Sequence, residues 1–301
     1  MTEQSVDPFM TTQSPDLASR GRAIGRAVAY LLIALASALL MSAVLKSVTG
    51  RTLQELMRSG PANGILAHVG LLLALVIIPT SISLRLWKEP FAYSGWSSVG
   101  GGRLGVLGLA CGAGLMGAYT ALLWASGVWT GTFVSVTFER VVQTVLLSAL
   151  LWLVQAAHEE GFHRGYAFVQ MSRAISFWPA AAILGLWFMW GHVGQDGATP
   201  VSLTTAGLFA LVLAYSFKRT GSLWFALGFH AAWNFMQSFV FGFANSGGRT
   251  LTALMTPNLQ GPPLLTGGPA GPEGSLLSLL AIATLAGIVR FGLKKRTVGS
   301  P

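Results

Sequence analysis

The chain has 301 residues, of which 52% are hydrophobic and only 10% are charged. A water-soluble domain of this size needs far more polar surface, so the composition predicts a membrane protein. The net charge of +9 does not indicate nucleic-acid binding, because the basic residues lie singly or in short groups at the ends of apolar runs. The single cysteine, Cys111, excludes a disulfide framework and a cluster of thiolate metal ligands.

Eight apolar runs meet or approach the roughly 20 residues that a helix needs to cross a bilayer. They are expected at residues 25–46, 64–85, 104–126, 140–160, 178–193, 200–217, 222–243 and 274–293. The fourth helix is expected to continue towards Met171 before the chain turns back. We therefore predict an all-α polytopic membrane protein, with about eight transmembrane helices that enclose an intramembrane polar cavity.

The composition divides the chain into five parts. Residues 1–24 are expected to form a disordered polar tail, and 25–135 three transmembrane helices. Residues 136–245 form a core that carries the polar motifs described below. Residues 246–273 are too rich in Pro and Gly to be helical, and 274–301 hold the last transmembrane helix and a basic C-terminus.

The basic residues also predict an orientation. With eight spans, 14 of the 19 Lys and Arg residues lie on the side that holds both termini, and five lie on the other. The positive-inside rule therefore places both termini in the cytoplasm. Because the first 19 residues are polar, no cleavable signal peptide is expected. We expect an integral, multi-pass protein of a bacterial plasma membrane, in contact with lipid.

Ionisable residues inside membrane spans cost at least ~2.5–3.5 kcal/mol each on insertion scales, so each requires an explanation. In this sequence they concentrate in three segments, which are AAHEEGFHRGY at 156–166, LWFMWGH at 186–192 and GFHAAWNF at 228–235. Each segment falls in a separate predicted helix. The three helices could therefore bring polar groups together in one cavity.

Spacing within the first segment assigns different roles to its two glutamates. Glu160 precedes Arg164 by four residues, which is the favourable orientation for a helical ion pair. Glu159 is rotated from Glu160 by about 100° on a helix, so the same arginine need not neutralise it. Glu159 is thus left free to act as a base.

The third segment provides hydrogen-bond donors. His230 and Asn234 are four residues apart, so they lie on one helical face and can donate to a developing oxyanion. If the fourth helix turns back near residue 172, Glu159 and His192 stand at similar heights on neighbouring helices. Four groups from three helices would then meet in one cavity.

These residues resemble the motifs of a known family. Residues 159–164 fit EExxxR, residues 188–192 fit FxxxH and residues 230–234 fit HxxxN. Together and in this order, the motifs are similar to those of the CAAX prenyl protease and bacteriocin-processing (CPBP, or Abi) family. The eight-span count also looks like that of the type II CAAX endopeptidase branch.

The resemblance implies peptide-bond hydrolysis by an intramembrane endopeptidase. In it, Glu159 and His192 would activate a water molecule, and His230 and Asn234 would stabilise the tetrahedral oxyanion.

The resemblance also implies supporting residues and a class of substrate. Glu160 and Arg164 would provide structural support, and Phe188 would line the site. The partner would be a peptide or protein, with a lipidated C-terminus or a leader-like or bacteriocin-like peptide as options, and no nucleic acid.

Metal dependence stays open in the sequence. Glu159, His192 and His230 could supply a His/His/carboxylate zinc site, or Glu159 could act as a base without a metal. The HEExxH string at 158–163 is not the zincin motif, because its histidines are five residues apart.

Other interpretations of the same residues remain. His68, His158 and His163 are interpreted as packed, hydrogen-bonded histidines, and Gly191 and Gly228 as positions of close helix approach. A proton- or ion-coupled transporter could use the acidic residues and histidines as a relay. A catalytically silent scaffold or immunity protein could keep the motifs for folding.

Overall fold

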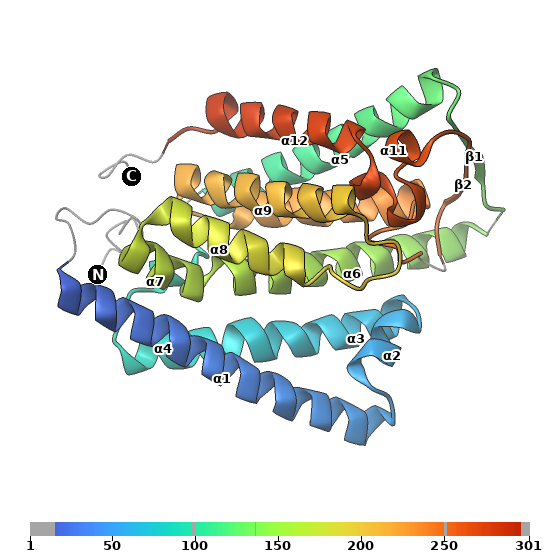
Figure 1. Cartoon of the computed structure of the whole chain (residues 1–301). Helices are drawn as coiled ribbons and strands as arrows, with labels where there is room; N and C mark the ends of the chain where they lie inside the picture. The colour runs from blue at the N-terminus through green and yellow to red at the C-terminus, as the bar shows by residue number, and fades with distance from the viewer. Residues whose placement is uncertain (1–15, 98–99, 136, 250–251, 296–301) are drawn as a thin grey trace.

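The computed structural model describes residues 16–97, 100–135, 137–249 and 252–295 as a bundle of helices with a small two-stranded sheet (Figure 1). The α-helices are α1 Leu17–Thr49, α2 Leu53–Arg58, α3 Pro61–Leu71, α4 Ile78–Leu86, α5 Gly101–Ala125, α6 Phe138–Arg164, α7 Tyr166–Ile175, α8 Phe177–Trp190, α9 Pro200–Thr220, α10 Trp224–Asn234, α11 Pro263–Thr266 and α12 Leu277–Gly287. The strands are β1 Trp129–Phe133 and β2 Met255–Leu259.

Shorter helical stretches complete the fold. The π-helical stretches η1 Leu72–Ile77, η3 Phe235–Val240 and η6 Ile288–Gly292 continue α3, α10 and α12. The 3-10 turns are η2 Phe91–Ser94, η4 Gly268–Ala270 and η5 Pro272–Gly274.

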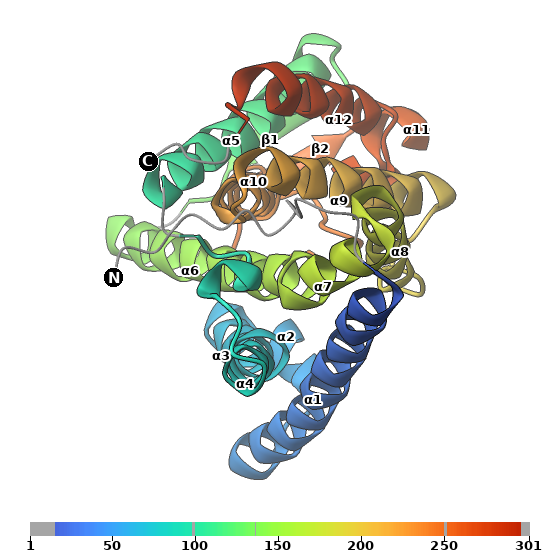
Figure 2. The same ribbon diagram turned by 90° about the vertical axis from the view of Figure 1, so that its left-hand side faces the viewer.

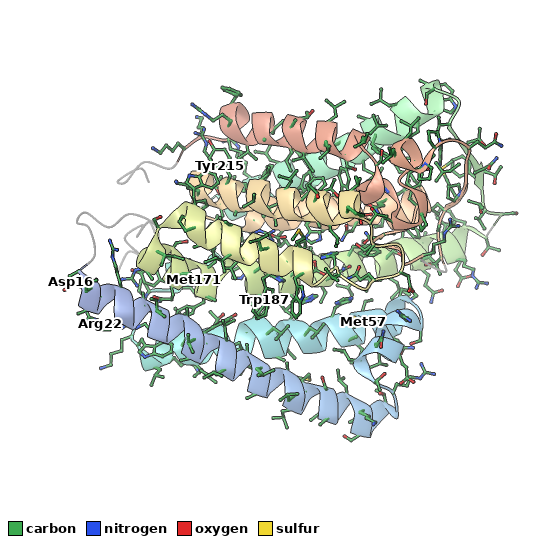
Figure 3. All side chains as sticks on the ribbon, viewed as in Figure 1. Asp16, Arg22, Met57, Met171, Trp187 and Tyr215 are labelled. Carbon is green, nitrogen blue, oxygen red and sulfur yellow. The ribbon has the colours of Figure 1, made fainter. Side chains whose placement is uncertain are left out.

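The all-α polytopic fold is confirmed, and every predicted span contains a helix. In the part of the chain that the structure describes, five helical segments are long and apolar enough to cross a membrane, and they are Leu17–Thr49, Pro61–Leu86, Gly101–Ala125, Phe138–Ile175 and Pro200–Thr220. Phe177–Trp190 and Leu277–Gly292 are shorter apolar helices. Side chains project outward from α1 (Figure 3). Its large apolar residues Leu32, Leu39 and Leu40 are exposed, which suits contact with lipid.

Two expectations need correction. Residues 17–24, which we expected in a disordered tail, form the first turns of α1, because the Asp16 side chain caps the helix by accepting a hydrogen bond from the Ser19 N–H at 2.8 Å. Residues 1–15 lie outside the described residues. The Pro/Gly-rich segment 246–273 contains β2, α11 and 3-10 turns, because β2 pairs antiparallel with β1, from Trp129 opposite Leu259 to Phe133 opposite Met255.

The predicted turn after the fourth helix is present. At Gly165 the helical path breaks between α6 and α7, and a Cβ there would lie 2.1 Å from the Gly161 carbonyl oxygen. Only glycine fits at this position. The chain then reverses at Ser176, whose φ is 72°, and α8 runs back along the bundle.

Helices α6 and α7 form the middle of the bundle. Viewed from the end that holds both chain ends, they lie between α1–α4 on one side and α5, α9, α10 and α12 on the other (Figure 2). Helix α10 is the most enclosed, with nine of its 11 residues buried. His230 and Asn234 on α10 are therefore kept away from lipid.

Glycines allow α5 and α10 to pack backbone to backbone. A Cβ at Gly108 would lie 2.2 Å from the Phe225 carbonyl oxygen, and one at Gly228 would lie 2.2 Å from the Gly105 carbonyl oxygen. Gly228 thus permits the close approach expected of it. A Cβ at Gly191 would lie 3.4 Å from the Phe188 carbonyl oxygen, which is an ordinary contact, so that glycine is not needed for helix packing.

Replacing a glycine at this interface should separate the two helices. We expect Gly108→Ala to lower the unfolding temperature, because a clash with backbone cannot be relieved by rotating a side chain and overpacking costs about 1–3 kcal/mol. Gly114→Ala on the same helix meets nothing within 4 Å and is the matched control. Thermal unfolding of detergent-purified protein, followed by tryptophan fluorescence, measures the effect. Equal unfolding temperatures for the two variants would contradict the close packing.

Candidate active site

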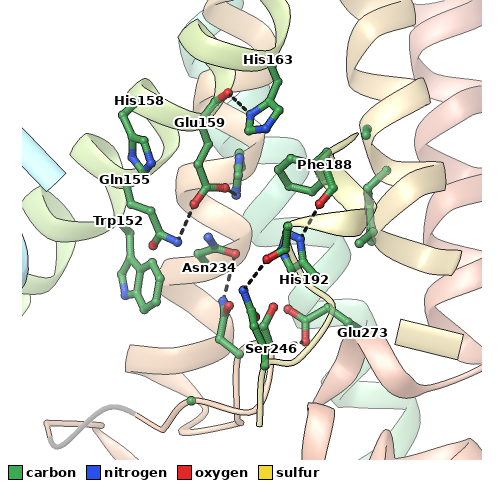
Figure 4. Close-up of a pocket in the computed structure, with 18 of the residues that line it drawn as sticks. Trp152, Gln155, His158, Glu159, His163, Phe188, His192, Asn234, Ser246 and Glu273 are labelled. Atoms are coloured by element: carbon green, nitrogen blue, oxygen red, sulfur yellow. Dashed lines mark hydrogen bonds and ion pairs between the residues drawn. The ribbon is translucent and has the colours of Figure 1, made fainter. Parts of the chain in front are cut away.

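A cavity of about 650 Å³ lies between the N-terminal helices and the central helices (Figure 4). Its wall includes residues of α2, α3, α6, α8, α9 and α10, together with the loops that follow α8 and η3. All seven residues expected in the site from the sequence line it, and these are Glu159, Glu160, Arg164, Phe188, His192, His230 and Asn234. The three motif segments therefore do converge on one space.

Glu159 faces the cavity from α6. Its Oε1 accepts a hydrogen bond from Gln155 Nε2 at 3.0 Å, and its Oε2 lies 3.6 Å from His230 Nε2. The side chain remains 18% exposed. Glu159 thus has an oriented carboxylate with room for a water molecule beside it.

Glu160 points the other way and is completely buried. Its Oε1 accepts hydrogen bonds from Arg164 Nη1 at 2.8 Å and from His230 Nδ1 at 2.9 Å. Arg164 also donates from Nε to the Ala210 carbonyl oxygen at 3.3 Å and lies over the Phe188 ring. The helical ion pair expected from the spacing is present, and it extends to α8, α9 and α10.

The contacts of His230 determine what its ring can donate. Nδ1 faces the Glu160 carboxylate and donates to it, because a carboxylate oxygen accepts. Nε2 faces Glu159. In a neutral ring with its proton on Nδ1, Nε2 can only accept, so His230 donates from Nε2 only when both ring nitrogens carry a proton.

His192 lies just beyond the end of α8. Its Nδ1 is 2.8 Å from the Phe188 carbonyl oxygen, which can only accept a hydrogen bond. The proton therefore lies on Nδ1, and Nε2 of the neutral ring is free to accept. The Phe188 ring packs against His192 at a centroid distance of 4.7 Å and fixes its position.

Asn234 lies one helical turn from His230 and is 95% buried, since only 5% of it is exposed. Its Oδ1 accepts a hydrogen bond from Asn245 Nδ2 at 3.1 Å. This contact fixes the amide so that its NH₂ group is the donor left for a ligand in the cavity. The arrangement suits stabilisation of an oxyanion.

The sequence did not indicate three further polar residues of the cavity, which are Gln155, Asn245 and Glu273. Gln155 precedes Glu159 by one helical turn, so its spacing was a usable signal. Asn245 and Glu273 come from segments without helical periodicity and carried no such signal. Glu273 accepts a hydrogen bond from Gln237, and burial raises the pKa of Glu273 to about 7.

The remaining histidines have packing contacts. His163 Nδ1 lies 2.8 Å from the Glu159 carbonyl oxygen, to which it donates. The rings of His68 and His158 stack at 5.1 Å, and both line the cavity wall. All three histidines are packed as expected, but the hydrogen bond is present only at His163, because among the described residues the buried Nδ1 atoms of His68 and His158 have no hydrogen-bond partner.

The residues considered for zinc were tested as a ligand set. Within the described residues, no three His, Cys, Asp or Glu side chains are grouped so that they could hold a metal ion. His230 Nδ1 is occupied by Glu160, and only its Nε2 faces Glu159. Glu159, His192 and His230 are therefore not arranged as a set of metal ligands.

The chain was compared with known proteins. Residues 141–236 match a family described as Type II CAAX prenyl endopeptidase Rce1-like. This segment is therefore similar to Rce1-like domains. It contains the three motifs that carry the resemblance, which is thereby confirmed over these residues. No curated protein and no solved structure matched.

The match supports a CAAX-type intramembrane protease, and hence a peptidase that acts on a peptide or protein. Together with the apolar helices, it supports an integral multi-pass membrane protein. The helices α1–α5 and the segment after residue 236 lie outside the match, although both contribute residues to the cavity wall.

Removing the partner of a buried charge should be costly. We expect Arg164→Met to destabilise the protein by roughly 3–5 kcal/mol, because it leaves Glu160 buried without its cation. Arg58→Met removes the exposed ion pair of Arg58 with Asp196, at 3.7 Å, and should cost about 1 kcal/mol or less. Thermal unfolding in detergent compares the two variants. A similar small loss for both would show that Glu160 does not depend on Arg164.

Proposed function

We propose that this protein is an intramembrane endopeptidase in which Glu159 and His192 activate a water molecule. The observation that carries this proposal is the convergence of two acceptors and two donors on one cavity. The acceptors are the Glu159 carboxylate and His192 Nε2, and the donors are the Asn234 amide and, when its ring carries a proton on both nitrogens, His230. Such a set matches the needs of peptide hydrolysis.

The proposed reaction begins when the water oxygen attacks the carbonyl carbon of the peptide. Glu159 accepts a proton from the water, while His192 Nε2 accepts a hydrogen bond that holds it in place. The negative charge that develops on the carbonyl oxygen is stabilised by Asn234 Nδ2–H and His230 Nε2–H. The proton on Glu159 then passes to the leaving amine as the C–N bond breaks, which yields a carboxylic acid and an amine. The remaining water proton of the acid then passes to the amine, so that the products leave as a carboxylate and an ammonium group.

Glu160 and Arg164 act as positioning residues in this mechanism. The Glu160 carboxylate accepts from His230 Nδ1 and thereby sets the ring so that Nε2 faces Glu159. Arg164 holds Glu160 in turn. Neither residue needs to touch the reacting atoms.

Substitutions of Glu159, the proposed base, and of Asn234, a proposed oxyanion donor, should reduce cleavage to different extents. We expect Glu159→Gln to abolish cleavage, since the amide cannot accept the water proton, and Asn234→Ala to reduce kcat by about 10²–10³. Glu139→Gln, at an exposed position in the first turn of the same helix, is the matched control and should be fully active. Cleavage of a panel of quenched peptides, with and without a prenylated C-terminus, measures these effects. Full activity of Glu159→Gln would remove Glu159 from the mechanism.

The position of the cavity opening indicates from which side of the membrane the substrate enters. The cavity wall includes Arg58 on α2 and Asp196 after α8, whose side chains are 68% and 83% exposed. These elements lie at the end of the bundle opposite both termini (Figure 1). With the cytoplasmic termini that the basic residues predict, the cavity would open to the extracytoplasmic side. Its substrate would then be the membrane-proximal part of an exported peptide.

This orientation can be tested with single cysteines in a Cys111→Ser background. Ser59 lies at the exposed end of α2 near the cavity, and Ala18 lies at the exposed start of α1, so each is replaced by cysteine in a separate variant. We expect a membrane-impermeant maleimide to label Ser59→Cys in intact cells, and Ala18→Cys only after permeabilisation. The reverse pattern would place the open end of the cavity in the cytoplasm.

A further inference from the structure

One carboxylate of the cavity has no part in the mechanism above. Glu273 lies in η5, outside the matched segment 141–236, and its side chain lines the same cavity as Glu159 and His192. Figure 4 shows Glu273 with Ser246 at the end of the cavity where His192 and Asn234 lie. A carboxylate there is costly unless it has partners or a ligand.

The neighbours of Glu273 suit an ionised carboxylate. Gln237 Nε2 donates to its Oε1 at 3.0 Å, and the Ser246 N–H donates to its Oε2 at 3.4 Å. The orientation of the Gln237 amide is fixed, because Nε2 also donates at 2.6 Å to the Ala244 carbonyl oxygen, which can only accept. Both groups that face Glu273 are therefore donors.

The backbone that carries Glu273 is also held firmly. Its carbonyl oxygen accepts a hydrogen bond from Thr205 Oγ1 at 2.6 Å. A Cβ at Gly271 would lie 2.0 Å from the Ala244 carbonyl oxygen, and one at Gly274 would lie 2.3 Å from the Gly267 carbonyl oxygen. These close backbone contacts admit only glycine. The Pro/Gly-rich sequence thus places the carboxylate at a defined point of the wall.

No cation of the described residues pairs with Glu273. Two arginines line the cavity, and each already has its own carboxylate: Arg164 pairs with Glu160, and Arg58 pairs with Asp196. The His230 ring, which is cationic in the proposed mechanism, faces Glu160 through Nδ1 and Glu159 through Nε2. The positive charge that would complement Glu273 must therefore come from a ligand.

We propose that Glu273 is a specificity subsite that binds a positively charged side chain, Lys or Arg, of the substrate peptide near the bond to be cleaved. This inference rests on the proposed function, since the peptide must occupy the cavity that holds Glu159. Burial raises the pKa of the Glu273 carboxyl, and a cation beside it favours the ionised form. A peptide with an acidic residue at this position would meet a like charge instead.

The test uses fluorescent decapeptide sets in which one position is Lys, Gln or Glu and the others are mixtures. Binding is measured by fluorescence anisotropy to the purified Glu159→Gln protein, which keeps the cavity but lacks the proposed base. We expect Lys at one position to lower Kd at least about tenfold relative to Gln. Glu273→Gln as a second substitution should abolish the preference for Lys peptides. Glu273→Lys as a second substitution should replace it with a preference for Glu peptides. Adding Glu139→Gln, the matched exposed carboxylate, should leave it unchanged.

Equal binding of the Lys and Gln sets, or a Lys preference that survives Glu273→Gln, would overturn the subsite. If Glu273→Gln fails to fold, Glu273→Asp keeps the charge but withdraws it by one methylene, and the Lys preference should weaken. Cleavage by the wild type is measured in parallel. Failure to cleave, together with a Lys preference that depends on Glu273, would contradict the proposed reaction and leave the subsite standing.

Discussion

The buried Glu160 carboxylate is the group on which the rest of the site depends. It is fully shielded from solvent, and an unpaired charge in such a place costs several kcal/mol. Two partners contact its Oε1, Arg164 from the next turn of α6 and His230 from α10. The contact that makes the buried charge tolerable is therefore the same contact that joins α10 to α6 and orients the His230 ring. Folding and chemistry are linked at one atom, Glu160 Oε1.

The segment between η3 and α12 has the composition of a linker, but it is packed as part of the cavity wall. A Cβ at Gly247 would lie 1.0 Å from the Asp196 carbonyl oxygen, and one at Gly197 would lie 2.7 Å from the Pro269 carbonyl carbon. Backbone thus meets backbone between the loop after α8 and two parts of this segment. The high Gly content is explained by these contacts, which bring Asn245 and Glu273 to the cavity.

The sequence predicted what depends on spacing within a helix and on the order of motifs. The pairing of Glu160 with Arg164 follows from the i, i+4 rule, and the eight apolar runs follow from bilayer thickness. It could not predict contacts that only tertiary packing creates. The pairing of β1 with β2 joins segments more than 100 residues apart, and Asn245 reaches Asn234 through a turn that has no periodic signal. The sequence did not predict the full length of α1, because hydropathy identifies only the apolar part of a helix. The first turns of α1 lie in a polar stretch, where Asp16 caps the helix.

In the proposed mechanism, the two adjacent glutamates separate a structural charge from a reactive one within one turn of helix. Glu160 turns inward to Arg164 and is fully buried, whereas Glu159 turns to the cavity, keeps 18% of its surface exposed and has the uncharged Gln155 as its hydrogen-bond donor. His230 touches both residues, so it can respond to proton transfer at Glu159 while Glu160 holds its position. An EE pair with one arginine at i+4 therefore supplies, from the same helical turn, a fixed anchor and the carboxylate that we propose as the base.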